Sequence, residues 1–117
     1  MKIEQMEKRI AGIKQALLDI GEMRPGSLSK QFSVCASKGC KCKDPVNPQK
    51  HGPYTQLSFV RHGKSTTRFI RPHQARDVKA QLAQYKKFRK LMDDWLSLAI
   101  ELAEVKLQAT RDATNQV

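Results

Sequence analysis

Residues 35–54 of this chain read Cys-Ala-Ser-Lys-Gly-Cys-Lys-Cys-Lys-Asp-Pro-Val-Asn-Pro-Gln-Lys-His-Gly-Pro-Tyr. This stretch contains all three cysteines of the chain, Cys35, Cys40 and Cys42, and His51 follows them. Lysines, glycines and prolines make up much of the rest, so almost nothing apolar is present to form a core. A segment of this composition stays disordered unless something other than hydrophobic burial fixes it. We expect a bound metal ion to do so.

Three thiolates and one imidazole form a complete tetrahedral ligand set for a structural zinc ion. We expect Cys35, Cys40, Cys42 and His51 to be the ligands, and we expect the tight turn between the first two to use Gly39 with a positive φ. His51 is preferred over the other two histidines, at positions 62 and 73, because it lies closest in sequence. The spacing differs from a pair of Cys-x2-Cys knuckles, so free or reactive cysteines are the alternative.

The positive charge of the chain is concentrated in its middle. Residues 25–76 carry ten basic side chains and one acidic side chain, Asp44, whereas residues 1–24 and 77–117 are each close to neutral. The net charge of the 117 residues is +11. Charge that served only solubility would be spread along the chain, so this concentration favours a polyanionic partner, with nucleic acid first.

A helix is expected over residues 2–22. Its apolar side chains alternate in steps of three and four, the seam of a coiled coil, at Ile3, Met6, Ile10, Ile13, Leu17 and Ile20. We expect the helix to end near Glu22, with Gly21 as C-cap and Pro25 preventing continuation. Packing against the rest of the same chain is favoured over a purely intermolecular coiled coil.

A second, longer helix is expected after Pro72, because residues 73–110 contain neither glycine nor proline. At about 1.5 Å per residue it would be roughly 50 Å long, against roughly 30 Å for the first helix. Part of its apolar stripe would then lack a partner within the chain, and we expect a homodimer through this helix. The residues assigned to helix packing and dimerisation are Tyr85, Phe88, Met92, Trp95 and Leu102.

Three short strands are expected between the helices, over residues 28–34, 54–60 and 65–70, where apolar and polar residues alternate. The last two would form a hairpin around His62 and Gly63. We expect a loop with an odd number of residues, which puts Leu57 and Phe59 on the same face as Thr67 and Phe69. The opposite face would then be polar and basic, with Gln56, Ser58, Thr66 and Arg68. An even loop would set Leu57 opposite Arg68.

Basic side chains surround both the cysteine stretch and the hairpin. Lysines neutralise phosphates without reading sequence, while arginines can also reach base edges. Tyr54, Phe59 and His62 are potential stacking residues, although Tyr54 and Phe59 are individually better explained as sheet or core residues. The candidate nucleic-acid-binding residues are Lys30, Lys38, Lys41, Lys43, Lys50, Tyr54, Arg61, Lys64, Arg68 and Arg71. The alternative is a solvated basic face.

We expect no enzyme. The sequence has no glycine loop for phosphates and no acidic cluster suited to Mg²⁺, and Asp93 and Asp94 are neighbours on a helix that point in different directions. The catalytic alternative is a thiol of the cysteine trio with His51 or His62 as base. Neither a signal peptide nor a run of about 20 apolar residues is present, so we expect a cytoplasmic protein with reduced thiols and no membrane association.

Residues 23–105 resemble a family of small, uncharacterised, basic prokaryotic proteins. The motifs that carry the resemblance are Met23-Arg24-Pro25-Gly26-Ser27-Leu28-Ser29, the three cysteines, His51-Gly52-Pro53-Tyr54, and Gly63-Lys64-Ser65-Thr66-Thr67-Arg68-Phe69. The resemblance implies a site at Cys35, Cys40, Cys42 and His51, a hairpin signature at Tyr54, Lys64 and Arg68, and a long final helix. Thr55 departs from the family, where an aromatic residue is common, so stacking at this position is not expected. A weaker similarity links the hairpin to modules in DNA-handling and mobile-element proteins.

Together these features predict an α+β fold. Its parts would be an N-terminal helix (1–22), a zinc knuckle with a three-stranded antiparallel sheet (23–71), a helix that pairs with the first (72–110) and a frayed tail (111–117). We expect a non-catalytic nucleic-acid-binding protein with structural Zn²⁺. DNA is preferred to RNA as the ligand, in a role accessory to a transposase or another DNA-handling protein. The alternatives are an RNA or ribonucleoprotein module and a protein–protein adaptor in which zinc only stabilises.

Overall fold

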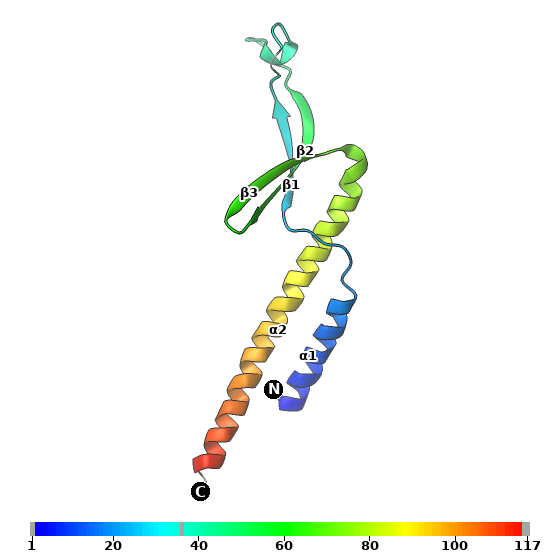
Figure 1. The fold of residues 1–117 in the computed structure, drawn as a ribbon. Helices are drawn as coiled ribbons and strands as arrows, with labels where there is room; N and C mark the ends of the chain where they lie inside the picture. Colours follow the sequence, from blue (N-terminus) through cyan, green and yellow to red (C-terminus); the bar gives the residue numbers. More distant parts are fainter. Residues whose placement is uncertain (1, 36, 116–117) are drawn as a thin grey trace. The chain divides into compact units, whose positions relative to one another are not determined.

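The computed structural model describes residues 2–35 and 37–115 and confirms the predicted α+β fold. The described residues form an N-terminal helix, three strands and a C-terminal helix, with a short 3₁₀ turn after the first strand and another after the third (Figure 1). The chain divides into two compact units, one of Met1–Glu22 with Gln84–Val117 and one of Met23–Ala83. We call these the helix unit and the sheet unit. Neither helix is apolar over enough of its length to cross a membrane, within the residues described.

The helix unit pairs α1 (Ile3–Leu18) with most of α2 (Ala75–Asn115). Met6 and Ile10 of α1 and Leu98 of α2 are buried at its centre. Around them pack partly buried residues of both helices, namely Ile3, Ile13, Trp95, Leu102 and Val105. Burial of a Leu, Ile or Met side chain contributes about 1.5–3 kcal/mol. The prediction that the first helix packs within its own chain is therefore confirmed.

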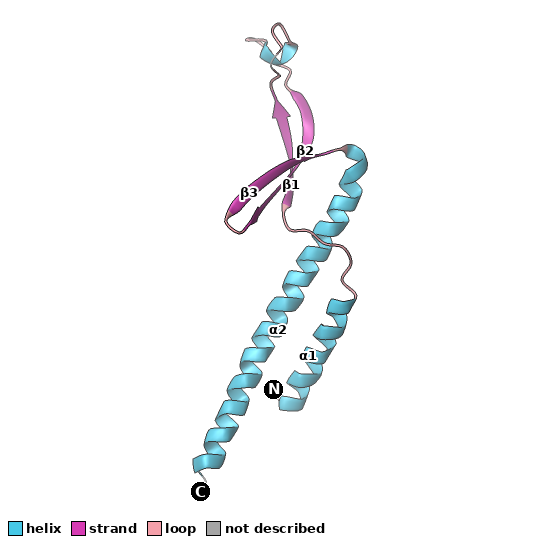
Figure 2. Ribbon diagram, viewed as in Figure 1, coloured by secondary structure: helices cyan, strands magenta, loops and turns pink. Residues whose placement is uncertain are grey.

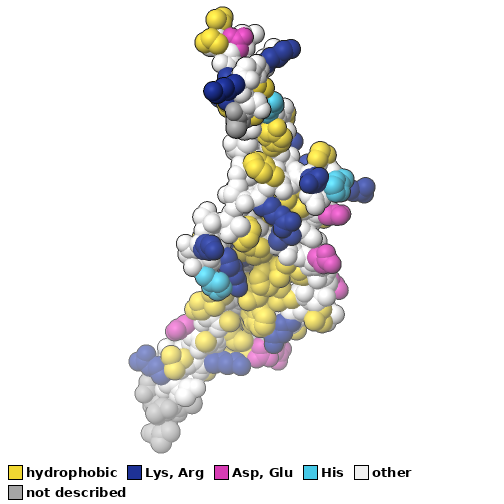
Figure 3. Space-filling view, turned by 45° about the horizontal axis from the view of Figure 1, so that its top comes forward, with side chains coloured by type: hydrophobic (Ala, Val, Ile, Leu, Met, Phe, Trp, Pro, Cys, Tyr) yellow, Lys and Arg dark blue, Asp and Glu magenta, His cyan; other side chains and the backbone are white. Residues whose placement is uncertain are grey.

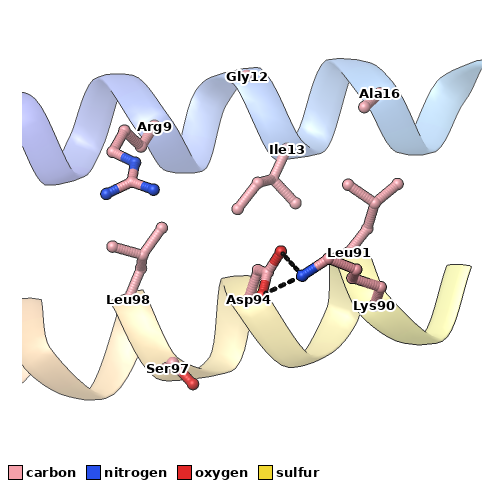
Figure 4. Close-up of a pocket in the computed structure, with 9 residues that line it drawn as sticks. All are labelled: Arg9, Gly12, Ile13, Ala16, Lys90, Leu91, Asp94, Ser97 and Leu98. Carbon is pink, nitrogen blue, oxygen red and sulfur yellow. Dashed lines mark hydrogen bonds and ion pairs between the residues drawn. The ribbon is translucent and has the colours of Figure 1, made fainter. Parts of the chain in front are cut away.

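A hollow lies between the two helices of this unit, with an ion pair at its edge. Figure 4 shows Ile13 of α1 and Leu91 and Leu98 of α2 directed toward the space between the helices, which has a volume of about 530 Å³. Lys90 and Asp94 form an ion pair of 3.3 Å at its edge. Such exposed pairs contribute little, typically below about 1 kcal/mol, so the apolar contacts hold the pair together.

The first helix ends at Leu18, earlier than the expected end near Glu22. The amides of Asp19 and Ile20 bond the carbonyls of Ala16 and Leu17, so the chain tightens into turns at this point. Gly21 is not the left-handed C-cap that was expected, because the C-cap is Asp19 with φ −89°. The Gly21 amide instead donates to Oε1 of Gln84 on α2 at 2.9 Å.

The second helix extends further than expected and reaches Asn115. The side chain of Gln108 donates to Asp112 at 3.0 Å, one turn later, and contacts of this spacing support isolated helices. The segment predicted to fray begins as helix, and its last two residues lie outside the described part of the chain.

The sheet unit contains the antiparallel strands β1 (Ser27–Ser33), β2 (His51–Arg61) and β3 (Lys64–Ile70), in the order β1-β2-β3 (Figure 2). A 3₁₀ turn, Pro72–Gln74, leads from β3 into α2. Leu57 of β2, Ile70 of β3 and Val78 of α2 are buried together. The first turns of α2 therefore cover one face of the sheet.

The predicted odd-numbered hairpin loop is wrong. Arg61 pairs with Lys64 across a two-residue loop, and Leu57 lies opposite Arg68. Both loop residues have positive φ, 52° at His62 and 75° at Gly63, which is the mirror-image turn that matches the twist of two paired strands. Glycine adopts this conformation freely, and histidine does so more readily than most residues.

This register decides which of two adjacent apolar residues enters the core. Ile70 lies opposite Thr55 and is 6% exposed, whereas Phe69 lies opposite Gln56 and is 64% exposed. The predicted polar and basic face is therefore corrected: Thr66 and Arg68 share the helix-covered face with Leu57. The other face, which we call the open sheet face, consists of Ser27, Ser29, Gln31, Tyr54, Gln56, Ser58, Val60, Ser65, Thr67 and Phe69.

Candidate metal centre

The four candidate ligands come from three neighbouring pieces of local structure. Cys35 follows β1, Cys42 lies in a 3₁₀ turn (Lys41–Lys43), Cys40 precedes that turn, and His51 begins β2. Gly39 has a φ of 77°, as predicted for the tight turn before Cys40. The pairing of Ser33 with His51 brings the two ends of the loop together. In Figure 1 this loop lies at the ends of β1 and β2.

The donor atoms of Cys35, Cys40, Cys42 and His51 all lie within 4.8 Å of one another. The sulfurs of Cys35 and Cys42 are 3.5 Å apart, and Sγ of Cys40 is 3.3 Å from Nε2 of His51. Zinc–sulfur bonds of about 2.3 Å would place two sulfurs of a tetrahedral site roughly 3.8 Å apart. These two separations are close to that value, so the cluster is a possible metal site, and the predicted convergence of these residues is confirmed.

The surroundings of the cluster are poor in apolar contacts. Cys42 is 2% exposed, and the backbone amide of Cys35 donates to its sulfur at 3.4 Å. Val46, the large apolar residue in the same loop, is 90% exposed and contributes no core. Asp44 accepts the amide of Val46, and the Gln49 amide donates to the carbonyl of Lys41, so short hydrogen bonds shape the loop locally. Among the described residues of this loop, the ligand cluster (Cys35, Cys40, Cys42 and His51) is the one buried centre.

The thiols and the imidazole of the cluster shift one another's pKa values. Chiefly through a hydrogen bond with His51, the pKa of the Cys35 thiol falls to about 6. The backbone N–H of Cys42 is the main cause of a lowered pKa at Cys40, while burial raises the pKa of Cys42 itself. Hydrogen bonds to Cys35 and Cys40 raise the pKa of His51. The lowered pKa values of Cys35 and Cys40 favour their thiolate forms, and the thiolate is the form that binds a metal.

A family model matches residues 3–80, which include α1, the cysteine loop, all three strands and the first residues of α2; it is described as a domain of unknown function, DUF6788. The chain belongs to this family. Searches of curated proteins and of solved structures found no match. The expected relationship to a family without an assigned activity is thereby confirmed at that level. The ligand cluster and the hairpin both lie inside the DUF6788 segment.

The lysines predicted to bind nucleic acid lie in several places around the DUF6788 sheet. Those at 38, 41, 43 and 50 are on the cysteine loop and exposed, and Figure 3 shows Lys and Arg side chains around this loop. Arg61 and Lys64 pair across the hairpin end. Lys30 and Arg68 lie on the edge strands, where Nζ of Lys30 donates to Oγ1 of Thr55 at 3.2 Å. Arg71 is exposed at the start of the turn into α2.

Acidic side chains do little to offset this charge within the sheet unit. Among residues 23–83, twelve side chains are basic and two, Asp44 and Asp77, are acidic. Asp44 accepts the backbone amides of Val46 and Asn47. The ion pairs Lys90–Asp94 and Lys106–Glu7 lie in the helix unit. The excess of positive charge therefore belongs to the unit that carries the ligand cluster.

The strand register determines which aromatic side chains face the core and which face solvent. Phe59 is partly buried and packs against the core of Leu57, Ile70 and Val78. Tyr54 is 42% exposed on the open sheet face, with its ring centre 5.9 Å from that of Phe69. Sequence reasoning missed Phe69 because the odd-loop register assigned it to the core. Phe69 and Ile70 are adjacent in one strand, so only one of them can face the core. This pair was the signal in the sequence that either hairpin register was possible.

The residues assigned to helix packing and dimerisation lie on two different surfaces of α2. Trp95 and Leu102 pack against α1 in the core of the helix unit. Tyr85 and Phe88 lie near one another, with ring centres 6.3 Å apart. Met92 is 40% exposed and, with Phe88 and Leu96, lines a hollow of about 390 Å³ on α2. The apolar stripe of α2 is therefore only partly used within the chain.

Proposed function

We propose that this chain is a non-catalytic nucleic-acid-binding protein in which a structural zinc ion holds a basic loop in place. One observation supports the proposal most directly: four metal-ligand side chains converge at the base of a loop with four exposed lysines. DNA is preferred to RNA as the ligand. The setting we propose is a reducing cytoplasm, where thiols stay available for a metal.

Zinc is the metal that best suits this donor set. Three thiolates with one imidazole are typical of closed, tetrahedral zinc sites, and softer ligands of this kind disfavour magnesium and calcium. Zinc would bind the Cys35, Cys40 and Cys42 sulfurs and Nε2 of His51. It would supply the fixed centre that the loop lacks in apolar contacts.

A structural role for the metal also argues against catalysis. Catalytic zinc keeps a position open for water or substrate, whereas four protein ligands fill a tetrahedral ion. Coordination would also occupy the Cys35 thiol, the strongest candidate nucleophile by its lowered pKa. We therefore propose a binding function and no enzymatic one.

The contact with nucleic acid would be mainly electrostatic. A short loop whose backbone is anchored by a metal has little backbone freedom to lose, which lowers the entropic cost of presenting its lysines to a phosphate backbone. The hairpin arginines extend the basic surface within the same unit. An accessory role beside a transposase or another DNA-handling protein is part of the proposal.

A homodimer through α2 is the second part of the proposal, and exposed apolar residues favour it. Met92, Leu96 and Ile100 are 40–60% exposed at helical spacing on one helix. Covering such a stripe in a second copy would remove apolar surface from water. The same stripe would serve a protein partner if the chain were instead an adaptor.

The binding proposal is tested with labelled duplex DNA, duplex RNA and single strands in a salt series. Engagement of about six phosphates predicts that log affinity falls with log salt at a slope near −5 for duplex DNA. The double variant Lys41→Glu/Lys43→Glu should weaken binding strongly. The matched control, Lys86→Glu/Lys87→Glu, makes the same charge change on exposed positions of α2 and should have a much smaller effect. Absence of binding at low salt, or equal effects of both variants, would contradict the proposal.

A further inference from the structure

The open sheet face differs in composition from the rest of this charged chain. Its ten residues include no charged side chain, although charged residues make up 28% of the sequence. Seven of the ten are Ser, Thr or Gln, whose hydroxyl and amide groups both donate and accept hydrogen bonds. The remaining three, Tyr54, Val60 and Phe69, are apolar or aromatic and exposed.

The two aromatic residues of this face form one surface. Phe69 on β3 lies opposite Gln56, and Tyr54 lies two residues before Gln56 on β2, so the rings are diagonal neighbours across two strands. Their centres are 5.9 Å apart with an angle of 64° between the planes. Phe69 nevertheless remains 64% exposed and Tyr54 42% exposed. Much of their aromatic surface therefore stays available to a planar ligand.

The charged residues of the sheet belong to its other face. Lys30 is on the edge strand β1, Arg68 is on the edge strand β3, and Arg61 with Lys64 is at the hairpin end, all at positions that alternate to the other face. A neutral, hydrogen-bonding face with exposed aromatic rings, in a unit with twelve basic and two acidic side chains, suits a ligand that has planar groups and an anionic backbone. An unpaired nucleotide has this chemistry, whereas a duplex keeps its base faces stacked and hidden.

We propose that Tyr54 and Phe69 form a platform on which unpaired bases of single-stranded nucleic acid stack. The inference rests on the proposed nucleic-acid function and assigns to it a preferred form of ligand. Ser29, Gln31 and Gln56, which flank the rings, would hydrogen-bond base edges. DNA and RNA both present the required base planes, so the platform would distinguish single strands from duplexes.

The test measures the affinity of the full chain for oligo-dT, oligo-rU and a duplex of equal length. Phe69→Ala and Tyr54→Ala should each weaken single-strand binding about tenfold, because stacking on an aromatic side chain contributes strongly for each base. Duplex affinity should be unchanged. The slope of log affinity against log salt should also be unchanged, since no phosphate contact is removed.

Val60→Ala is the matched control, because Val60 is as exposed as Phe69 on the same face but has no ring. It should leave every affinity as it was. Phe69→Tyr keeps a ring and should retain single-strand binding, which separates stacking from damage to the fold. The ratio of oligo-dT to oligo-rU affinity tells which strand the face accepts better.

Different results would refute the stacking platform and the proposed nucleic-acid-binding function. If both alanine variants bind single strands normally while Lys41→Glu/Lys43→Glu abolishes binding, the platform is wrong and the basic loop stands. If Val60→Ala weakens binding as much as Phe69→Ala does, stacking is also refuted. If the unmodified chain binds no nucleic acid at low salt, the proposed function fails and the platform fails with it.

Discussion

Cys42 is the most enclosed residue of the candidate metal centre, and His51 is the one that links it to the sheet. The sulfur of Cys42 receives the amide of Cys35, while His51 is the first residue of β2 and pairs with Ser33 of β1. A metal bound at this cluster would therefore be coupled to the sheet through the first residue of β2.

Substitution at His51 tests the ligand set directly. His51→Ala should reduce bound metal strongly, because the loss of one of four ligands opens the site to water and weakens binding by orders of magnitude. His73→Ala, an exposed histidine in the turn before α2, should leave the metal content as it was. Equal metal content in both variants, measured by mass spectrometry, would show that His51 is no ligand.

The candidate fourth ligand could be chosen from the sequence by proximity alone, whereas Phe69, the proposed base-stacking residue, could not be found in this way. Cysteines and a nearby histidine indicate metal binding from residue type and spacing alone, without knowledge of the backbone conformation. Phe69 has no such signature, since its role depends on whether it faces the core or the solvent. That orientation is decided by the register of the hairpin, which a change of one loop residue reverses.

At the scale of elements, the hairpin is the part that sequence reasoning placed wrongly. Periodicity located both helices and all three strands, because apolar residues recur at helical or alternating spacing there. The His62-Gly63 turn was read as part of a longer loop, since the two-residue mirror-image turn is best known for Asn-Gly and Asp-Gly. Burial of Ile70 beside Leu57 and Val78 favours the shorter loop.

The turn can be tested by substitution at its two residues. Gly63→Ala should destabilise the protein by about 1 kcal/mol or more, because alanine disfavours the left-handed conformation at φ 75° although open space surrounds the site. His62→Asn should be neutral or stabilising, since asparagine adopts this conformation more readily. Thermal or denaturant unfolding measures both. A loss of stability with His62→Asn equal to that with Gly63→Ala would argue against the two-residue turn.

The first helix offers a complementary test. Gly12 lies in the interior of α1, and a Cβ added there would meet no atom within 4 Å. Gly12→Ala should therefore stabilise the helix unit by about 0.5–1 kcal/mol, as expected for glycine replaced in a helix interior. Leu98→Ala, which empties a buried position of the same unit, should cost about 2–5 kcal/mol. The free energy of unfolding of the two variants should shift in opposite directions.

On the scale of the whole molecule, the helix unit and the cysteine loop differ in how much apolar packing supports them. Met6, Ile10 and Leu98 provide the helix unit with an apolar core that contains no candidate metal ligand. The cysteine loop has little apolar support and would depend on the metal. The concentration of positive charge in the sheet unit places the proposed binding function in the metal-dependent part.

Removal of the metal should therefore affect the molecule unevenly. A strong chelator should increase hydrogen exchange of backbone amides in residues 37–50, while amides of α1 and of the α2 segment packed against it remain protected. Nucleic-acid affinity should fall at the same time, and added zinc should restore it. Uniform loss of protection along both helices would contradict the separation of the two units.

The proposed dimer is tested at this scale as well. Leu96 is 60% exposed, so Leu96→Glu should leave the chain folded and shift a homodimer toward monomer in sedimentation. Lys86→Glu introduces the same carboxylate at an exposed position that is already polar and should leave the dimer intact. A monomeric mass for the unmodified chain at high concentration would remove the dimer from the proposal.

We propose that a metal ion bound by three sulfurs and one imidazole gives the basic loop its structure. The most direct measurement is the metal content of the purified protein, by mass spectrometry, paired with hydrogen exchange of the loop in the same sample. We predict about one zinc per chain and a protected loop. A metal-free protein whose loop is equally protected would contradict the claim.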